Sequence, residues 1–207
     1  MLDKGSHTVL KSMNPNTSTA LLCRVDSPSI RITWLPAALL CLSATLASCL
    51  ATEEVLVQPQ TMIIDPSLPK AQVEAQALAA RRYDTFWSTG DEALARSALA
   101  ADFTDRTLPP GRPQGLAGPL AASKTVRAAI PDMWCDVDQM IMTGDRVVVH
   151  LRFRGHFTGR FKGMQGQGQA IEFIATDIYR MADGRIADNW HLEDNLTFLQ
   201  QLGLIGK

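Results

Sequence analysis

The sequence predicts an α+β domain in which helices come first and an antiparallel sheet follows. Between residues 70 and 89 the apolar residues recur at helical spacing. From residue 134 onward, apolar and polar residues alternate as they do in strands, and turn signals such as Thr143-Gly144-Asp145 divide the segments. Helices and strands are segregated along the chain, which favours α+β over an alternating α/β arrangement.

The composition is that of a globular protein, with 46% hydrophobic and 20% charged residues among 207 and a net charge of −1. No basic run stands out, so we expect no nucleic-acid partner. The four cysteines lack spacings such as CxxC, so we expect no metal site.

Residues 1–48 have the features of a secretory signal. Arg31 precedes the apolar stretch "ITWLPAALLCLSATLAS", which ends in small residues. The tetrapeptide "LASC" ending at Cys49 resembles the bacterial lipobox, in which the cysteine is lipidated and becomes the first residue. We therefore expect cleavage before Cys49 and a lipid anchor in the cell envelope, on the periplasmic side. The alternative is an uncleaved anchor of marginal length.

Leu50, rather than an aspartate, follows the lipidated cysteine, which favours the outer membrane over the inner. After cleavage only Cys49 and Cys135 remain, and a lipidated Cys49 cannot pair, so we expect no disulfide. Residues 49–69 contain three prolines and show no period, so they are interpreted as a tether. The domain is expected to span residues 70–207.

Three helices are expected in the first half of the domain. The first covers residues 70–89 and stops at Gly90, and Asp91 can cap a short second helix through Leu99. A short strand, "DFTDRT", then leads into a loop rich in proline and glycine. Ser123 can cap a third helix, which Pro131 ends.

The second half is expected to be β, closed by a hairpin and a short terminal helix. On residues 171–179 the odd positions share one face, and that face is apolar except for Asp177. A three-residue loop, Ala182-Asp183-Gly184, with a bulge would pair Asp177 with Asn189 and make His191 its diagonal neighbour on the same face. A two-residue Asp-Gly turn would instead put Asp177 and His191 on opposite faces. We prefer the bulged form.

The hairpin is expected to line a pocket, because an acid on an apolar face is costly unless it is paired or opens onto a cavity. Asp177 and His191 are the candidate catalytic pair, and the alternative is a buried polar pair without chemistry. Glu193 and Asp194 are more simply part of the start of the terminal helix. The further candidates for the pocket lining are Asp105, Asn189, His156, Tyr179, Phe173 and Trp134, although Trp134 is also a natural core residue.

The segment "GHFTGRFKGMQGQGQAIEFIATDIYRMADGRIADNWHLEDNLTFLQQLG" resembles the SnoaL-like polyketide cyclases, also called ester cyclases. These belong to the superfamily shaped like nuclear transport factor two. The matching features are "G-x-F-x-G", a glycine-rich turn, "D-I-Y-R", "D-G-R-I" and a closing "Q-Q-L-G". "YDTFWSTGDEALARSALAADFTD" fits the opening of the family, so the resemblance covers roughly residues 70–205.

The resemblance implies a cone of three helices wrapped by a curved antiparallel sheet around an apolar cavity. It also implies cofactor-free acid–base chemistry, in which an aspartate of the last strand removes a proton next to a carbonyl. His191 stands at that aspartate's position, and Asp177 stands where the family has a pocket histidine. Asp105 falls on a polar pocket position. Aspartate and histidine are therefore exchanged relative to the family pattern. We expect acid–base chemistry in which His191 is the base and Asp177 orients its ring.

Three functions follow from these observations. The first is a small-molecule enzyme of isomerase, lyase or hydrolase type that acts on an apolar carbonyl compound without a cofactor. The second is a non-catalytic envelope lipoprotein that binds an apolar ligand, and the third is a partner-binding module whose cavity is filled by side chains. We also expect a homodimer, because an apolar outer sheet face needs cover. Its residues are Ile174, Ile178, Ile186, Trp190 and Leu192.

Overall fold

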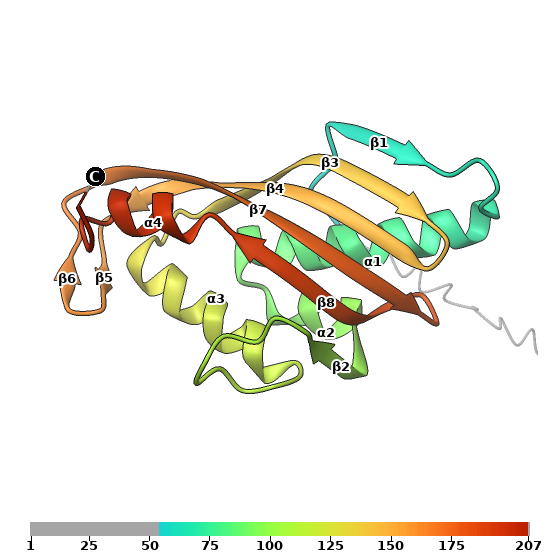
Figure 1. Ribbon diagram of the computed structural model, residues 1–207, viewed down its shortest axis with the longest axis horizontal. Coiled ribbons are helices and arrows are strands. Elements are labelled where there is room, and N and C mark those ends of the chain that lie inside the picture. The colour runs from blue at the N-terminus through green and yellow to red at the C-terminus, as the bar shows by residue number, and fades with distance from the viewer. Residues whose placement is uncertain (1–53, 207) are drawn as a thin grey trace, which may run out of the picture. The chain divides into compact units, whose positions relative to one another are not determined.

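The computed structural model describes residues 54–206, which lie in one compact unit of the chain, residues 51–207 (Figure 1). The expected signal, residues 1–48, and Cys49 lie outside the described residues. Among residues 54–206, no helix is both long enough and apolar enough to cross a membrane.

The helices begin and end at identifiable signals. Helix α1 (Lys70–Thr89) stops at Gly90, whose φ of 76° is a left-handed conformation that glycine adopts readily. Helix α2 (Glu92–Ala98) is capped by the Asp91 side chain, and α4 (Asn195–Gln201) is capped by Asp194. Helix α3 (Ala117–Ala129) begins six residues before the expected cap. Pro119 lies in its first turn, where a missing N–H costs nothing.

A curved sheet of six strands covers one side of helices α1, α2 and α3 (Figure 1). The strand order is β1-β3-β4-β7-β8-β2, and β5 and β6 form a separate small hairpin. The bounds are β1 Thr61–Ile64, β2 Leu99–Asp105, β3 Trp134–Thr143, β4 Arg146–Phe157, β5 Arg160–Phe161, β6 Met164–Gln165, β7 Gln169–Ala182 and β8 Arg185–Glu193.

The sheet is mixed rather than purely antiparallel as expected. The four central strands pair antiparallel, whereas β1 pairs parallel with β3 and β2 pairs parallel with β8. Both edge strands are followed or preceded by helices that carry the chain across the concave face, which is the connection that parallel pairing requires. The α+β class itself is confirmed.

The described part of the expected tether belongs to the folded domain. Strand β1 lies inside residues 49–69, and its flanks bond to β3 from Gln60 N to Val137 O and from Asp65 N to Met142 O, each at 2.9 Å. Leu56 is buried in the core. Sequence pattern could not show this, because all four residues of β1 are exposed and carry no alternation.

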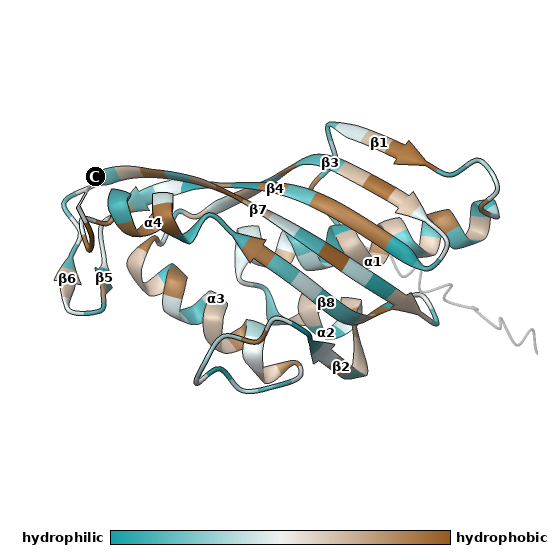
Figure 2. Ribbon diagram, viewed as in Figure 1, coloured by the Kyte–Doolittle hydropathy of each residue, from teal (hydrophilic) through white to brown (hydrophobic). Residues whose placement is uncertain are grey.

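The core lies between α1 and the concave face of the sheet. Apolar stretches alternate with polar ones along β4, β7 and β8 (Figure 2), as expected for strands with one buried face. Gly159 allows the β5–β6 hairpin to meet the end of α3, because a Cβ at this position would lie 1.9 Å from Ala128 O. The hairpin therefore folds back over the end of the core where the cavity described below opens.

Candidate functional site

The β7–β8 hairpin places Asp177 directly opposite His191. Its turn has two residues, Asp183 with φ 49° and Gly184 with φ 70°, so the expected three-residue loop is not formed. An extra residue, Ala187, then interrupts the ladder, because Met181 pairs with Ile186 but Arg180 pairs with Asp188. This bulge restores the alternation that the shorter turn would have reversed. Asp177 and His191 therefore share the concave face, as expected, but as a direct pair rather than a diagonal one.

A cavity of about 330 Å³ opens beside this pair. Most of its wall is apolar, and the carboxyl and imidazole groups in the lining come from the end of β2, from β7 and from β8. Asp105, Asp177, Asn189 and His191, four of the candidate residues, line it together with Phe173. The other apolar lining residues include Trp87, Phe103, Leu151, Phe153, Phe161 and Phe198.

Two carboxylates hold the ring of His191. Nδ1 lies 2.7 Å from Glu193 Oε1, and Nε2 lies 3.1 Å from both oxygens of Asp105. Asp105 reaches the ring because β2 pairs parallel with β8, which sets Asp105 beside Asn189. The side chains of His191 and Asp105 are only 8% and 6% exposed. Glu193 and Asp105, not Asp177, therefore orient the imidazole.

The surroundings of His191 favour its charged form. Burial disfavours the imidazolium, but the hydrogen bond and charge of Glu193 oppose it, with further support from Asp177 and Asp105. The balance raises the pKa of His191 to about 9. At neutral pH the ring is an imidazolium with both nitrogens engaged, so it cannot accept a proton as the sequence led us to expect.

Asp177 has the opposite character, that of a carboxyl that ionises near neutrality. Burial raises its pKa to about 6, while the hydrogen bond from Asn189 Nδ2, at 2.9 Å, and the charge of His191 limit the rise. An acid with such a pKa is a suitable proton acceptor at neutral pH. Perturbed carboxyls in cavities are frequent functional groups.

A second buried acid stands behind Asp177. The Tyr179 hydroxyl donates to Asp84 Oδ1 at 2.8 Å and lies 3.4 Å from Asp177 Oδ2. Tyr179 is thus part of the core behind the cavity wall, rather than of the lining itself. Asp84 is fully buried, and burial raises its pKa well above the usual range, which favours the protonated carboxyl.

Tyr83 of α1 is a further functional candidate, which the helical spacing of apolar residues did not distinguish from the core. Its side chain is 2% exposed and lines the cavity. Burial, followed by the charges of Asp177 and Asp105, raises its pKa well above the usual range. The Trp87 side chain forms a hydrogen bond with its hydroxyl, and because the indole N–H can only donate, this bond leaves the phenolic proton available. A neutral phenol donor is therefore free beside the two carboxylates.

Besides Tyr179, two more of the expected lining residues lie elsewhere. Trp134 is 49% exposed and donates from Nε1 to Asp136 at 2.8 Å on the outer face, because the even positions of β3 that precede its bulge point away from the core. His156 is exposed and bonds Asp132 at 2.7 Å. The structure also adds Arg112 and Lys162 to the lining. Both are in loops, where no sequence period signals orientation.

Metal-binding geometry is absent from the described part of the chain, in which no group of three or more His, Cys, Asp or Glu side chains is arranged to hold a metal ion. Cys135, the cysteine that lies within it, is buried and free.

Known proteins share this architecture. The solved structures similar to this chain include a candidate polyketide cyclase from Bacillus cereus, with 39% identity over 73% of this chain and 95% of that chain and a TM-score of 0.67. Another is IdmH, a candidate polyketide cyclase from Streptomyces antibioticus, with 28% identity, 64% and 98% coverage and a TM-score of 0.55. A SnoaL-like protein from Jannaschia, at 19% identity and a TM-score of 0.58, shows the fold alone.

The comparison with curated proteins found no match. The family model of SnoaL-like polyketide cyclases matches residues 77–202, which include both β7 and β8 and all the polar residues of the cavity. The chain therefore belongs to the SnoaL-like polyketide cyclase family.

Proposed function

We propose that this protein removes a proton next to the carbonyl group of an apolar small molecule, as the first step of a cyclisation or isomerisation. The observation that carries the proposal is the pairing of Asp177, with a pKa of about 6, and the imidazolium of His191 on the wall of one apolar cavity. The reaction as written needs no cofactor.

The geometry favours Asp177 as the base. Its carboxylate takes the proton from carbon, and the C=O becomes an enolate whose oxygen accepts a hydrogen bond from the Tyr83 hydroxyl. The enolate then either attacks a second carbonyl, which forms a C–C bond and an alkoxide that takes the proton back from Asp177, or regains that proton at another carbon. His191 holds Asp105 and Glu193 in place and offsets their charge, because both of its nitrogens are already bonded.

Proton exchange tests this proposal without knowledge of the natural substrate. The full chain is incubated in D₂O with a panel of aryl ketones and β-keto esters, and loss of the α-proton signal is followed by NMR. Wild type should exchange suitable ketones, and Asp177→Asn should lower the rate by about 10²–10⁴-fold, as expected for loss of a general base. Tyr83→Phe should lower the rate without abolishing ligand binding.

A non-catalytic envelope lipoprotein that binds an apolar ligand is the second candidate. The observation that favours it is that every polar atom of His191 is satisfied by the protein, as in a structural pair. Binding of the same ketones with no exchange above buffer, in wild type and Asp177→Asn alike, would support this candidate and reject the enzyme.

The lipid anchor remains a proposal that rests on the sequence. "LASC" after an apolar run supports lipidation of Cys49 and attachment to the periplasmic side of the envelope, with the outer membrane preferred. Mass spectrometry of the native protein should show a chain that begins at a diacylated Cys49. An unmodified Cys49, or a chain that retains residues 30–48, would reject the anchor.

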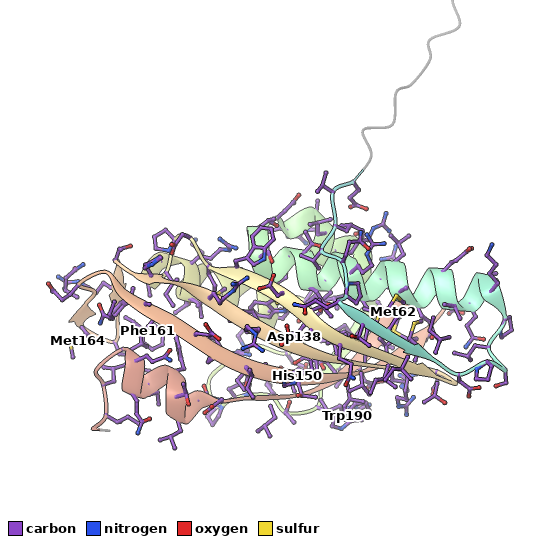
Figure 3. The ribbon with its side chains drawn as sticks, turned by 90° about the horizontal axis from the view of Figure 1, so that it is seen from above. Met62, Asp138, His150, Phe161, Met164 and Trp190 are labelled. Carbon is purple, nitrogen blue, oxygen red and sulfur yellow. The ribbon has the colours of Figure 1, made fainter. Side chains whose placement is uncertain are left out.

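We also propose a homodimer through the outer face of the sheet. Ile174, Ile178 and Leu192 are 40%, 39% and 77% exposed there, and Trp190 lies on the same face (Figure 3). Ile186 must be removed from the expected set, because the bulge turns it into the core, where it is fully buried. Sedimentation of the purified full chain should give twice the monomer mass at micromolar concentration, and a strict monomer would reject the proposal.

A further inference from the structure

Two cations that play no part in the proposed proton transfer also line the cavity. Arg112 belongs to the loop between β2 and α3, and Lys162 lies at the turn between β5 and β6. Figure 3 shows this hairpin, marked by Phe161 and Met164, at one end of the sheet. The two charges therefore reach the cavity from separate segments of the chain.

Both side chains carry their charge close to other residues of the cavity lining. The charge of Arg112 reaches Glu193: burial raises the pKa of this glutamate, whereas the hydrogen bond and charge of His191 and the charge of Arg112 lower it. Lys162 Nζ lies 5.7 Å from the ring centre of Phe161, which is itself a lining residue. Both charges thus act on residues of the cavity wall.

Neither cation has a partner among residues 54–206. No carboxylate lies within 4.0 Å of the Arg112 or Lys162 nitrogens, and neither side chain forms a hydrogen bond there. Other arginines of this part of the chain do form ion pairs: Arg82, Arg96, Arg106, Arg146, Arg152, Arg154 and Arg180. An unpaired guanidinium beside an apolar cavity is suited to a planar anion such as a carboxylate.

The backbone places Lys162 at the first position of the two-residue turn between β5 and β6. Its φ is 45°, a left-handed conformation that is uncommon for residues with a Cβ. Asparagine or glycine would occupy this first turn position with less strain.

We propose that the substrate of this enzyme carries a carboxylate, bound by Arg112 and Lys162, at the opposite end from its reacting carbonyl. The inference rests on the proposed function and adds the substrate class. The three carboxylates of the inner wall, Asp105, Asp177 and Glu193, repel an anion, so the charged end stays near the two cations. That orientation directs the carbonyl toward Asp177 and Tyr83.

A matched pair of ligands tests this directly. 3-(2-Naphthoyl)propionate and its methyl ester share an aryl ketone and differ in one charge. Their dissociation constants are measured by calorimetry on the full chain in detergent, together with the D₂O exchange of each ketone. In wild type the acid should bind about five- to tenfold more tightly, the range for a partly exposed charge-assisted contact, and the preference should shrink in high salt.

Three variants locate the effect. Arg112→Gln and Lys162→Gln should each reduce the preference for the acid, and the double variant should remove it while affinity for the ester stays unchanged. Arg160→Gln is the control, because Arg160 is an exposed cation of the same hairpin that does not line the cavity. It should leave both affinities unchanged.

The outcomes separate the inference from the proposed function. Equal binding of acid and ester by wild type, with exchange of either ketone, would overturn the inference and leave the proton-transfer function intact. A preference for the acid that survives in the double variant would overturn it as well, because the anion would bind elsewhere. If neither compound binds, the proposed cavity function fails and the inference fails with it.

Discussion

His191 carries its charge at neutral pH because Glu193 and Asp105 hold both nitrogens of its ring. Strand alternation predicted that Asp177, Asn189 and His191 share one face, and the resemblance added Asp105. All four line the cavity. The sequence assigned Glu193 to the start of α4, although Glu193 is two residues from His191 and so shares its face. Asp194 alone caps that helix.

The raised pKa of His191 predicts a pH-dependent contribution to stability. The pKa rises from 6.5 unfolded to about 9 folded, so the contribution is complete below pH 6.5 and is lost as pH rises to about 9. Replacement by His191→Gln should therefore cost up to about 3 kcal/mol more at pH 6 than at pH 9.5.

Urea unfolding of both proteins across this range measures the difference. A variant whose free energy of unfolding runs parallel to that of wild type at every pH would show that His191 titrates normally.

Replacement of Asp84 should increase the free energy of unfolding, whereas replacement of His191 should decrease it. Because burial raises its folded pKa, the unfolded state loses the proton first, and wild type loses stability as pH rises above 3.8. Asp84→Asn removes this ionisation, so it should become more stable than wild type by up to about 1.4 kcal/mol for each pH unit above 4. Thermal unfolding at pH 4, 5.5 and 7 gives the slope.

Asp91→Asn, at the exposed cap of α2, is the matched control and should show no such gain. A pH-independent difference for Asp84→Asn would mean that Asp84 is ionised in the folded protein.

At the scale of elements, the β7–β8 hairpin decides which side chains enter the cavity. The sequence predicted the correct face by an incorrect route, because it expected one bulged loop where the chain has a tight turn and a separate bulge. The Asp-Gly dipeptide signals the turn. Ala187 carries no comparable signal, since an alanine fits either face of a strand and the distortion depends on contacts with β2 that the sequence does not reveal.

The bulge predicts that deletion of Ala187 leaves the pairing of Asp177 with His191 unchanged. Without Ala187, one residue instead of two lies opposite Arg180, so Asp177 still faces His191 and the pKa of His191 should stay near 9. Deletion of Trp190 instead places Leu192 opposite Asp177 and turns His191 away from the cavity.

NMR titration of the imidazole in the two deletion variants distinguishes these cases. A normal histidine pKa after loss of Ala187 would contradict the assignment of this residue as the extra one.

For the whole molecule, composition and pattern were sufficient for the α+β class and for three helices followed by a sheet. The start of α3 and the existence of β1 were not predicted, because both depend on tertiary contacts. Strand β1 is exposed throughout and is held by its parallel pairing with β3. The alternation of apolar and polar residues predicts a strand only where one face is buried, so it cannot predict an exposed strand such as β1.

Strand β1 and the buried Leu56 before it should matter for stability. Removal of residues 54–65 uncovers the edge of β3 and takes Leu56 from the core, so the free energy of unfolding should fall by about 2–4 kcal/mol. Leu56→Ala isolates the core part, and Val55→Ala is its control because Val55 is 91% exposed. Denaturation midpoints that match wild type for the truncated chain would show that this segment is only a linker.

The parallel pairing of β2 with β8 also constrains the order in which the protein can fold. Asp105 and His191 are 86 residues apart, and the two strands that bring them together are the second and the last among residues 54–206. Contacts of such long separation form slowly, because the entropy of closing the loop must be overcome first. During synthesis α1, β3 and β4 emerge well before β8. Asp105 therefore lacks its counter-charge, His191, until almost the whole domain has been made. The cavity therefore completes its polar lining last, and a chain stalled before residue 191 has Asp105 and Asp177 but lacks the imidazolium that lies between them.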